Sequence, residues 1–364
     1  MVQLTLAAAI FNIFTPDVFQ FVSFLPAHAM AVLFIALALH FYDVKMKPFR
    51  FFIVTWCLTV SLLFYQSWAP LFVPLCLIII FRNKAYRAIP VVFLIYILAA
   101  IADLISIRFG WALLHVNTFS RVGSGSPVQN IISIINLQPA LWLNSLGISS
   151  WEFLAILIII LAAGLTLVKQ KKIWIGQAFT LVIVVIALAF LPHVLTDQFW
   201  PSHRSLVVIA AIPGIILLTM PYTKIKVYAT VALLVFQLLI IWKFGNQLLM
   251  VNREDQQQVS QFISQINNYE KDNNIRISTI AYGTDASPQA SYPFAPASYD
   301  LNARATILGW AFEPLVKFVS HRYFNYEIMT DAHKVEIFGK ADWTEFTPDE
   351  EIVFKGDKAY ILWY

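Results

Sequence analysis

Long apolar runs separated by short polar segments dominate the first 244 residues of the chain. They lie at about 1–14, 21–42, 51–65, 69–81, 88–108, 151–168, 173–191, 205–220 and 227–244. A helix needs about 20 apolar residues to cross a bilayer. The pattern therefore predicts an α-helical polytopic membrane protein, with about eight or nine transmembrane helices over residues 1–244.

The apolar stretch 51–81 is too long for one spanning helix. Polar residues Tyr65, Gln66 and Ser67 interrupt it, and Pro70 and Pro74 follow. Proline is poorly tolerated inside a helix because it lacks a backbone N–H group. We therefore predict two helices that turn back on each other, with Tyr65 and Gln66 at the tip.

The remaining residues, 245–364, predict a small α/β domain. The pattern favours a helix at about 254–272, an alternating strand at 275–279, a loop rich in Pro, Ser and Ala at 284–301, a helix at 309–320, and strands 351–355 and 358–363 around a tight turn. No Gly-rich phosphate loop or nucleophile motif occurs in this domain.

Composition agrees with a membrane protein, because 59% of the residues are apolar, 13% are charged and the mean hydropathy is +0.70. Soluble domains carry roughly a quarter charged residues. These values exclude a soluble enzyme and a nucleic-acid-binding domain, and they indicate the lipid bilayer as a partner. The net charge of +4 hides a division, because residues 1–244 hold 15 of the 25 basic residues but 5 of the 21 acidic ones.

The positions of the basic residues predict the orientation. Four short loops carry Lys45, Lys47 and Arg50; Arg82, Lys84 and Arg87; Lys169, Lys171 and Lys172; and Lys224 and Lys226, whereas the opposite loops, 109–150 and 192–204, carry Arg121 and Arg204. Cytoplasmic loops are enriched in Lys and Arg. We therefore expect a multi-pass protein of the bacterial inner (plasma) membrane, with a cytoplasmic N-terminus and an extracytoplasmic C-terminal domain. The basic and the less basic loops alternate between the two sides of the membrane only if the segment 51–81 crosses the membrane twice.

A charged cluster at the predicted outer face is the strongest candidate for chemistry. His193, Asp197, His203 and Arg204 lie within twelve residues, next to Trp200. A carboxylate such as that of Asp197 can take a proton from an attacking hydroxyl, Arg with His can bind a phosphate, and an aromatic ring can stack on a sugar. A solvated interfacial loop with an aromatic belt is the alternative.

Other candidates lie at predicted outer turns or helix ends. Asp17 is a candidate base or a charge that complements a helix N-terminus. Arg121 precedes a Gly/Ser run. Tyr65 and Gln66 are polar at a position where a turn alone does not require polar side chains. The spacing of Asp103 and Arg108 favours a local ion pair. His28 and His40 lie in an apolar segment and are expected to be packed and hydrogen-bonded. Cys57 and Cys76 are expected at buried apolar positions. No metal-ligand spacing or cofactor motif is visible, which leaves dependence on a divalent metal open.

Two segments resemble a known family. Pro16-Asp17-Val18-Phe19-Gln20-Phe21-Val22-Ser23-Phe24, followed by a span rich in small residues, and later Phe64-Tyr65-Gln66-Ser67-Trp68-Ala69-Pro70, resemble the serotype-converting O-antigen glucosyltransferases of the Gtr type II group. Arg204-Ser205-Leu206 at the start of a span and the terminal domain fit as well. The resemblance covers about residues 1–260.

The resemblance implies a GT-C class membrane glycosyltransferase. Its donor would be a glucosyl or related sugar on a polyprenyl phosphate, and its acceptor a surface polysaccharide or lipid-linked glycan. The chain begins inside what resembles the family's second or third helix, without the acidic first outer loop that usually supplies the base. Either the start of the gene is wrong, or the protein is a fragment, or Asp17 or Asp197 provides the base. Arg204, His203, His193 and Arg121 would then contact the lipid phosphate, and Tyr65, Gln66 and Trp200 the sugar or acceptor. A polysaccharide polymerase or flippase, or a truncated inactive paralogue, are the alternatives.

Overall fold

The computed structural model describes residues 25–114, 126–145, 173–194, 208–220, 222–295, 302–340 and 342–364. The chain divides into two compact units, Met1–Lys243 and Phe244–Tyr364, one residue from the boundary expected from the sequence. The expected spans at 1–14 and 151–168 lie outside the described residues.

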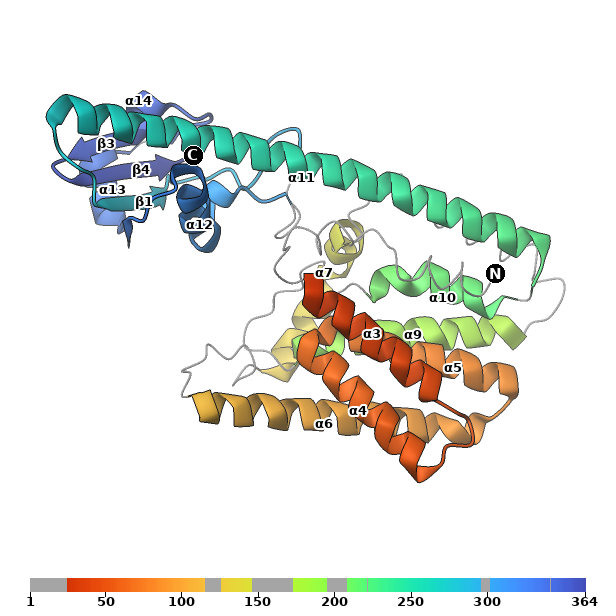
Figure 1. Cartoon of the computed structure of the whole chain (residues 1–364). Coiled ribbons are helices and arrows are strands. Elements are labelled where there is room, and N and C mark those ends of the chain that lie inside the picture. The colour runs from red at the N-terminus through yellow and green to blue at the C-terminus, as the bar shows by residue number, and fades with distance from the viewer. Residues whose placement is uncertain are drawn as a thin grey trace. The chain divides into compact units, whose positions relative to one another are not determined.

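Helices make up the described part of the first unit (Figure 1). They are α3 (Leu25–Phe41), α4 (Pro48–Phe64), η2 (Gln66–Leu71), α5 (Phe72–Asn83), η3 (Tyr86–Ala88), α6 (Ile89–Leu114), α7 (Pro127–Ser145), α9 (Ile173–Val194), η5 (Ile209–Ala211), α10 (Ile212–Thr219) and the start of α11 (Lys224–Asn273). The chain passes into the second unit within α11.

Three stretches of the described chain are long and apolar enough to cross a membrane: Gln66–Asn83, Tyr86–Gly110 and the helix Lys224–Asn273. In α6, Ile97, Ile101 and Ile105 are each about half exposed or more, whereas Ile95 and Ala99 are buried. A protein in water rarely exposes so continuous an apolar face. The first unit is therefore helical and compatible with insertion into a membrane, and the full set of eight or nine spans remains a prediction.

The break predicted at Tyr65 and Gln66 is confirmed. Helix α4 ends at Phe64, Tyr65 has extended backbone angles (φ −162°, ψ 106°), and the 3₁₀ helix η2, which contains Pro70, begins at Gln66. The arms do not form the tight pair that was expected, because α4 packs mainly against α3 and α6 whereas α5 packs against α6 and α9.

Two basic residues of the cationic loops bind backbone carbonyls at the C-terminal end of α10. The Arg82 guanidinium donates to the Leu218 oxygen at 2.9 Å, and the buried Lys226 Nζ donates to the Met220 oxygen at 2.9 Å. Cations at helix C-termini satisfy orphan carbonyls and oppose the helix dipole. These two side chains are structural as well as part of the topological charge bias.

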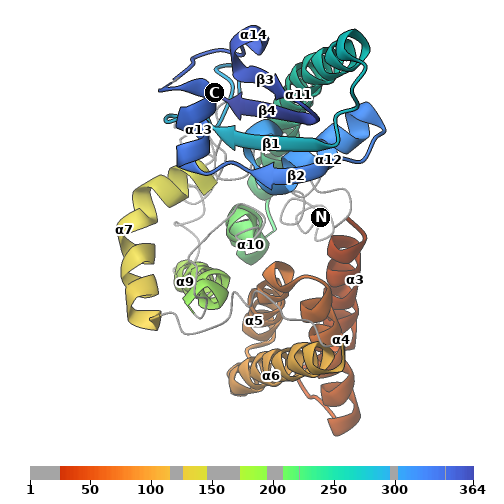
Figure 2. The ribbon, with the colours of Figure 1, turned by 90° about the vertical axis from the view of Figure 1, so that its left-hand side faces the viewer.

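The second unit contains a four-stranded sheet in the order β2-β1-β4-β3, which Figure 2 shows side by side. Its elements after α11 are β1 (Thr279–Thr284), η6 (Ala305–Ile307), α12 (Gly309–Ser320), β2 (Asn325–Ile328), α13 (Asp331–Phe338), α14 (Pro348–Glu351), β3 (Ile352–Lys355) and β4 (Lys358–Trp363). Strand β1 is parallel to β2 and β4, and β3 is antiparallel to β4. The α/β domain predicted from the sequence therefore exists as a mixed sheet.

Alternate side chains of the sheet form two cores, because successive side chains of a strand point to opposite faces. Ile280 and Ile361 pack with the second half of α11 and with α12, whereas Ala281 and Leu362 pack with α13. The sheet thus lies between helices on both faces, which explains why β1 is buried over Thr279–Gly283.

Candidate functional site

The structure describes three of the nine site residues predicted from the sequence. Tyr65 and Gln66 lie at the α4–η2 break, and His193 is the penultimate residue of α9. Asp17, Arg121, Asp197, Trp200, His203 and Arg204 lie outside the described residues. The described structure therefore does not test whether the residues of the predicted outer cluster come together.

Gln66 contacts a buried acid. Its side-chain Nε2 donates a hydrogen bond of 3.0 Å to Oδ2 of Asp103 on α6. Asp103 is 3% exposed, and its second oxygen, Oδ1, is buried without a hydrogen-bond partner among the described residues. The expected pair with Arg108 is not formed, and the partner of Asp103 is instead 37 residues earlier in the chain.

An aromatic group extends the cluster from the same break. Trp68 Nε1 donates to Nδ1 of His28 at 2.8 Å, and the His28 and Tyr65 rings lie 3.8 Å apart between centroids. Since an indole nitrogen only donates, Nδ1 of His28 accepts, and neutral His28 carries its proton on Nε2. His28 is 4% exposed, which confirms that it is packed and hydrogen-bonded.

We call Gln66, Asp103, His28, Tyr65 and Trp68 the break cluster. Asp103 is the one acidic residue in the 26-residue apolar helix α6, and an acid at such a position is expensive unless it has a function or a partner. That signal was available in the sequence. The contact with Gln66 was not, because nothing in the spacing relates positions 66 and 103.

The break cluster has the groups needed for proton transfer and for binding hydroxyls. One oxygen of Asp103 accepts a hydrogen bond from Gln66, while the other is buried and has no hydrogen-bond partner among the described residues. A carboxylate positioned in this way can accept a proton from a hydroxyl that attacks an activated carbon. In the described part of the chain no three His, Cys, Asp or Glu side chains gather as metal ligands.

The second unit holds a different polar network, centred on Arg304. This side chain is fully buried, donates through Nη1 to the Tyr364 carbonyl at 2.7 Å and through Nη2 to Gln258 Oε1 at 3.3 Å, and lies over the Tyr364 ring. Buried charges need hydrogen-bond partners, and both terminal nitrogens of Arg304 have them, whereas its Nε is buried without one among the described residues. These contacts join α11, the segment before η6 and the end of β4, which is a structural role.

Comparisons with known proteins identify no relative of this chain. No family model, no curated protein and no solved structure matches the chain. The function is therefore argued from the break cluster and the charge distribution, beside the resemblance noted from the sequence.

Proposed function

We propose that the protein is a polyprenyl-phosphate-sugar-dependent glycosyltransferase that transfers a glucosyl or related sugar to a surface polysaccharide, such as O-antigen, at the outer face of the bacterial inner membrane. The observation that carries the proposal is the break cluster. It is a buried polar site inside an apolar helical unit, and one of its carboxylate oxygens has no hydrogen-bond partner among the described residues.

The break cluster and the basic loop 43–47 lie at opposite ends of α3. His28 is the fourth residue of α3, and Tyr42 follows its last residue. The separation of 14 positions between them corresponds to roughly 21 Å along a helix. If the basic loops face the cytoplasm, as the charge bias predicts, this separation supports a position of the break cluster toward the outer face.

The position of Asp103 along α6 agrees with this placement. It follows Ile89, the first residue of α6, by 14 residues, again roughly 21 Å of a hydrocarbon layer about 30 Å thick. A flippase needs polar groups along a path through the midplane, whereas the predicted topology would put Asp103, the single acid of α6, in the outer third of the layer. This depth favours a transferase over the polymerase or flippase alternative.

Each candidate residue has a role in the proposal. Asp103 joins Asp17 and Asp197 as a possible base. Gln66 holds the Asp103 carboxylate, and Tyr65 with Trp200 contacts the sugar or the acceptor. Arg204, His203, His193 and Arg121 bind the lipid phosphate, as the charge-assisted hydrogen bonds of such groups permit.

The first experiment is a sugar analysis of the surface polysaccharide from cells with and without the gene. The proposal predicts a sugar that is lost on deletion and restored by the wild-type gene. An unchanged polysaccharide would refute the proposal and favour the inactive paralogue.

The second experiment assigns the base. Transfer from a polyprenyl-phosphate sugar is measured for purified Asp103→Asn, which should lose about 10²- to 10⁴-fold in rate if Asp103 is the base. Asp43→Asn, an exposed acid paired with Arg50, is the matched control and should keep the wild-type rate. A wild-type rate for Asp103→Asn would return the assignment to Asp17 or Asp197.

A further inference from the structure

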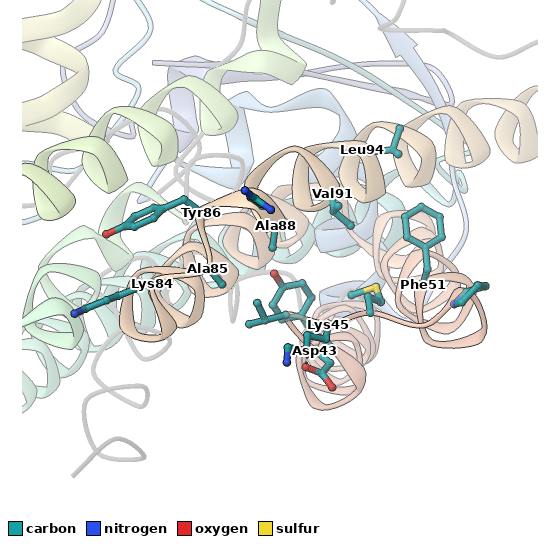
Figure 3. Close-up of a pocket in the computed structure, with 14 residues that line it drawn as sticks. Asp43, Lys45, Phe51, Lys84, Ala85, Tyr86, Ala88, Val91 and Leu94 are labelled. Carbon is teal, nitrogen blue, oxygen red and sulfur yellow. Dashed lines mark hydrogen bonds between the residues drawn. The ribbon is translucent and has the colours of Figure 1, made fainter.

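A cavity of about 1020 Å³ lies at the end of the helical unit opposite the break cluster. Two loops that are about 40 residues apart in sequence line it, one from Tyr42 to Pro48 and the other from Lys84 to Ala88. Figure 3 shows Asp43 and Lys45 of the first loop below Ala85 and Ala88 of the second. Both loops belong to the basic set that predicts the cytoplasmic face.

The cavity is positively charged in one part and apolar in another. In Figure 3, Lys84 and Tyr86 lie toward one end, whereas Phe51 and Leu94 lie toward the other. Val91 adds to the apolar lining. A basic region that continues into an apolar groove matches a molecule with an anionic head and a hydrocarbon tail.

The cations of the cavity are available to a ligand. Asp43 is the acid in the lining, and it is already bound by Arg50 at 3.0 Å. The side chains of Lys45, Lys84 and Arg87 have no hydrogen-bond or ion-pair partner in the described part of the chain. Three unpaired cations around one cavity therefore remain for an anion.

One more polar group in the wall lacks a partner. Tyr42 is 8% exposed, and its hydroxyl is buried with no hydrogen bond to any described residue. An unpaired buried donor is unfavourable in folded proteins, so a ligand oxygen that bonded to this hydroxyl would stabilise it.

We propose that this cavity binds the phosphate headgroup of an anionic phospholipid from the inner leaflet, with Lys45, Lys84 and Arg87 on the phosphate and the acyl chains along Phe51, Val91 and Leu94. Basic pockets between membrane helices on the cytoplasmic side bind anionic headgroups. The volume exceeds the range of about 300–1000 Å³ typical of small-molecule sites, and therefore accommodates a headgroup and the start of its chains. This inference is independent of the proposed glycosyltransferase activity.

The test compares two pairs of lysine substitutions in the purified full-length protein in detergent. Lys45→Gln/Lys84→Gln removes two cations from the cavity. Lys47→Gln/Lys224→Gln removes two exposed cations of the same set of loops that do not line it. Binding of dioleoylphosphatidylglycerol and of dioleoylphosphatidylcholine is measured by native mass spectrometry.

The wild type should bind phosphatidylglycerol in preference to phosphatidylcholine. The cavity pair should weaken phosphatidylglycerol binding about tenfold or more, and the control pair less than twofold. Lys45→Arg/Lys84→Arg keeps the charge and should keep the binding, which separates lost charge from misfolding. Equal losses in both glutamine pairs, or none in the cavity pair, would overturn the proposal.

A third arm distinguishes the lipid from free phosphate. Inorganic phosphate and glycerol phosphate are added as competitors at concentrations that match and greatly exceed that of the lipid. Failure of both to displace phosphatidylglycerol supports a lipid site, because the apolar contacts then contribute. Displacement at matching concentration would show a phosphate site and overturn the lipid assignment.

Discussion

At the scale of single residues, the membrane unit depends on how it satisfies a few buried polar atoms. Among the described residues Asp103 has one hydrogen bond, from Gln66, and it lies in a helix whose side chains are mostly apolar. A buried polar group left without a partner loses about 1–3 kcal/mol, more when it is charged. Gln66 and Asp103 should therefore behave as an energetic pair.

A double-mutant cycle measures this coupling. Gln66→Leu leaves the Asp103 carboxyl unpaired and should destabilise the protein in detergent by about 1–3 kcal/mol. Asp103→Leu in the same background removes the orphaned carboxyl and should restore part of the loss. Thermal unfolding followed by circular dichroism gives both values, and additive effects would show that the two side chains do not interact.

Glu351 in the second unit predicts a pH dependence. Its side chain is fully buried, and burial raises its pKa from 4.5 to about 7 despite a hydrogen bond from the Thr347 backbone N–H. Between these two pH values the unfolded chain has released the proton that the folded chain keeps. Stability therefore falls as the pH rises from about 4.5 to about 7, and is level above that.

Glu351→Gln should remove most of this dependence and, at pH 8, stabilise the second unit by up to about 3 kcal/mol. Hydrogen exchange of the β3 and β4 amides in the full-length protein, at pH 5 and pH 8, measures the effect. Glu336→Gln, at an exposed position of α13, is the control and should change neither value. A pH dependence that survives Glu351→Gln would assign it to other groups.

At the scale of elements, local patterns predicted some pieces well. Helix 309–320 and strand 358–363 occur at the predicted positions, and the strand expected at 351–355 begins one residue later, because each is defined by nearby side chains and a tight turn. The prediction of a strand at 275–279 is wrong, because the strand β1 runs from Thr279 to Thr284. A strand buried on both faces reads as a continuous apolar run rather than an alternation.

Strand β2 was not predicted for a related reason. Asn325–Ile328 is a short edge strand whose residues are mostly exposed, and its parallel pairing with β1 involves residues 46 positions apart. Neither feature leaves a local pattern. Contacts between distant segments, such as this one and that of Gln66 with Asp103, are what the sequence alone does not reveal.

The turn between β3 and β4 provides a test at this scale. Gly356 has φ +61°, a conformation that side chains with a Cβ rarely adopt. Gly356→Ala should therefore destabilise the hairpin by about 1 kcal/mol, seen as faster hydrogen exchange in β3 and β4. Gly245→Ala, at a helical position with open space around the added Cβ, should not, and equal effects would contradict the turn argument.

At the scale of the whole molecule, the distribution of charge predicts a topology that can be mapped. Alkaline phosphatase, which is active only outside the cytoplasm, should be active when fused after residue 364 and inactive when fused after residue 84. The reason is the excess of Lys and Arg in the loops that include Lys45 and Lys84. The opposite pattern would invert the membrane orientation and contradict the outer location of the proposed chemistry.

The candidate site shows the same division between local and distant information. Tyr65 and Gln66 were found from the sequence because polar residues interrupt an apolar run. The sequence favours structural roles for Asp103 and His28, and only the fold shows that they contact residues at the α4–η2 break. The sequence alone shows a charged residue in an apolar helix, whereas the partner of that residue depends on how the helices pack.

The strand order of the second unit also constrains when this unit can fold. Strand β1 obtains one of its two neighbours from β4, whose first residue follows the end of β1 by 74 residues. At about 5–20 residues per second, synthesis of that interval takes roughly 4–15 s. Throughout this time β1 has an open edge that another chain can pair with. A nascent chain is thus vulnerable to aggregation until its final strand emerges, and a ribosome that pauses before Lys358 would prolong that exposure.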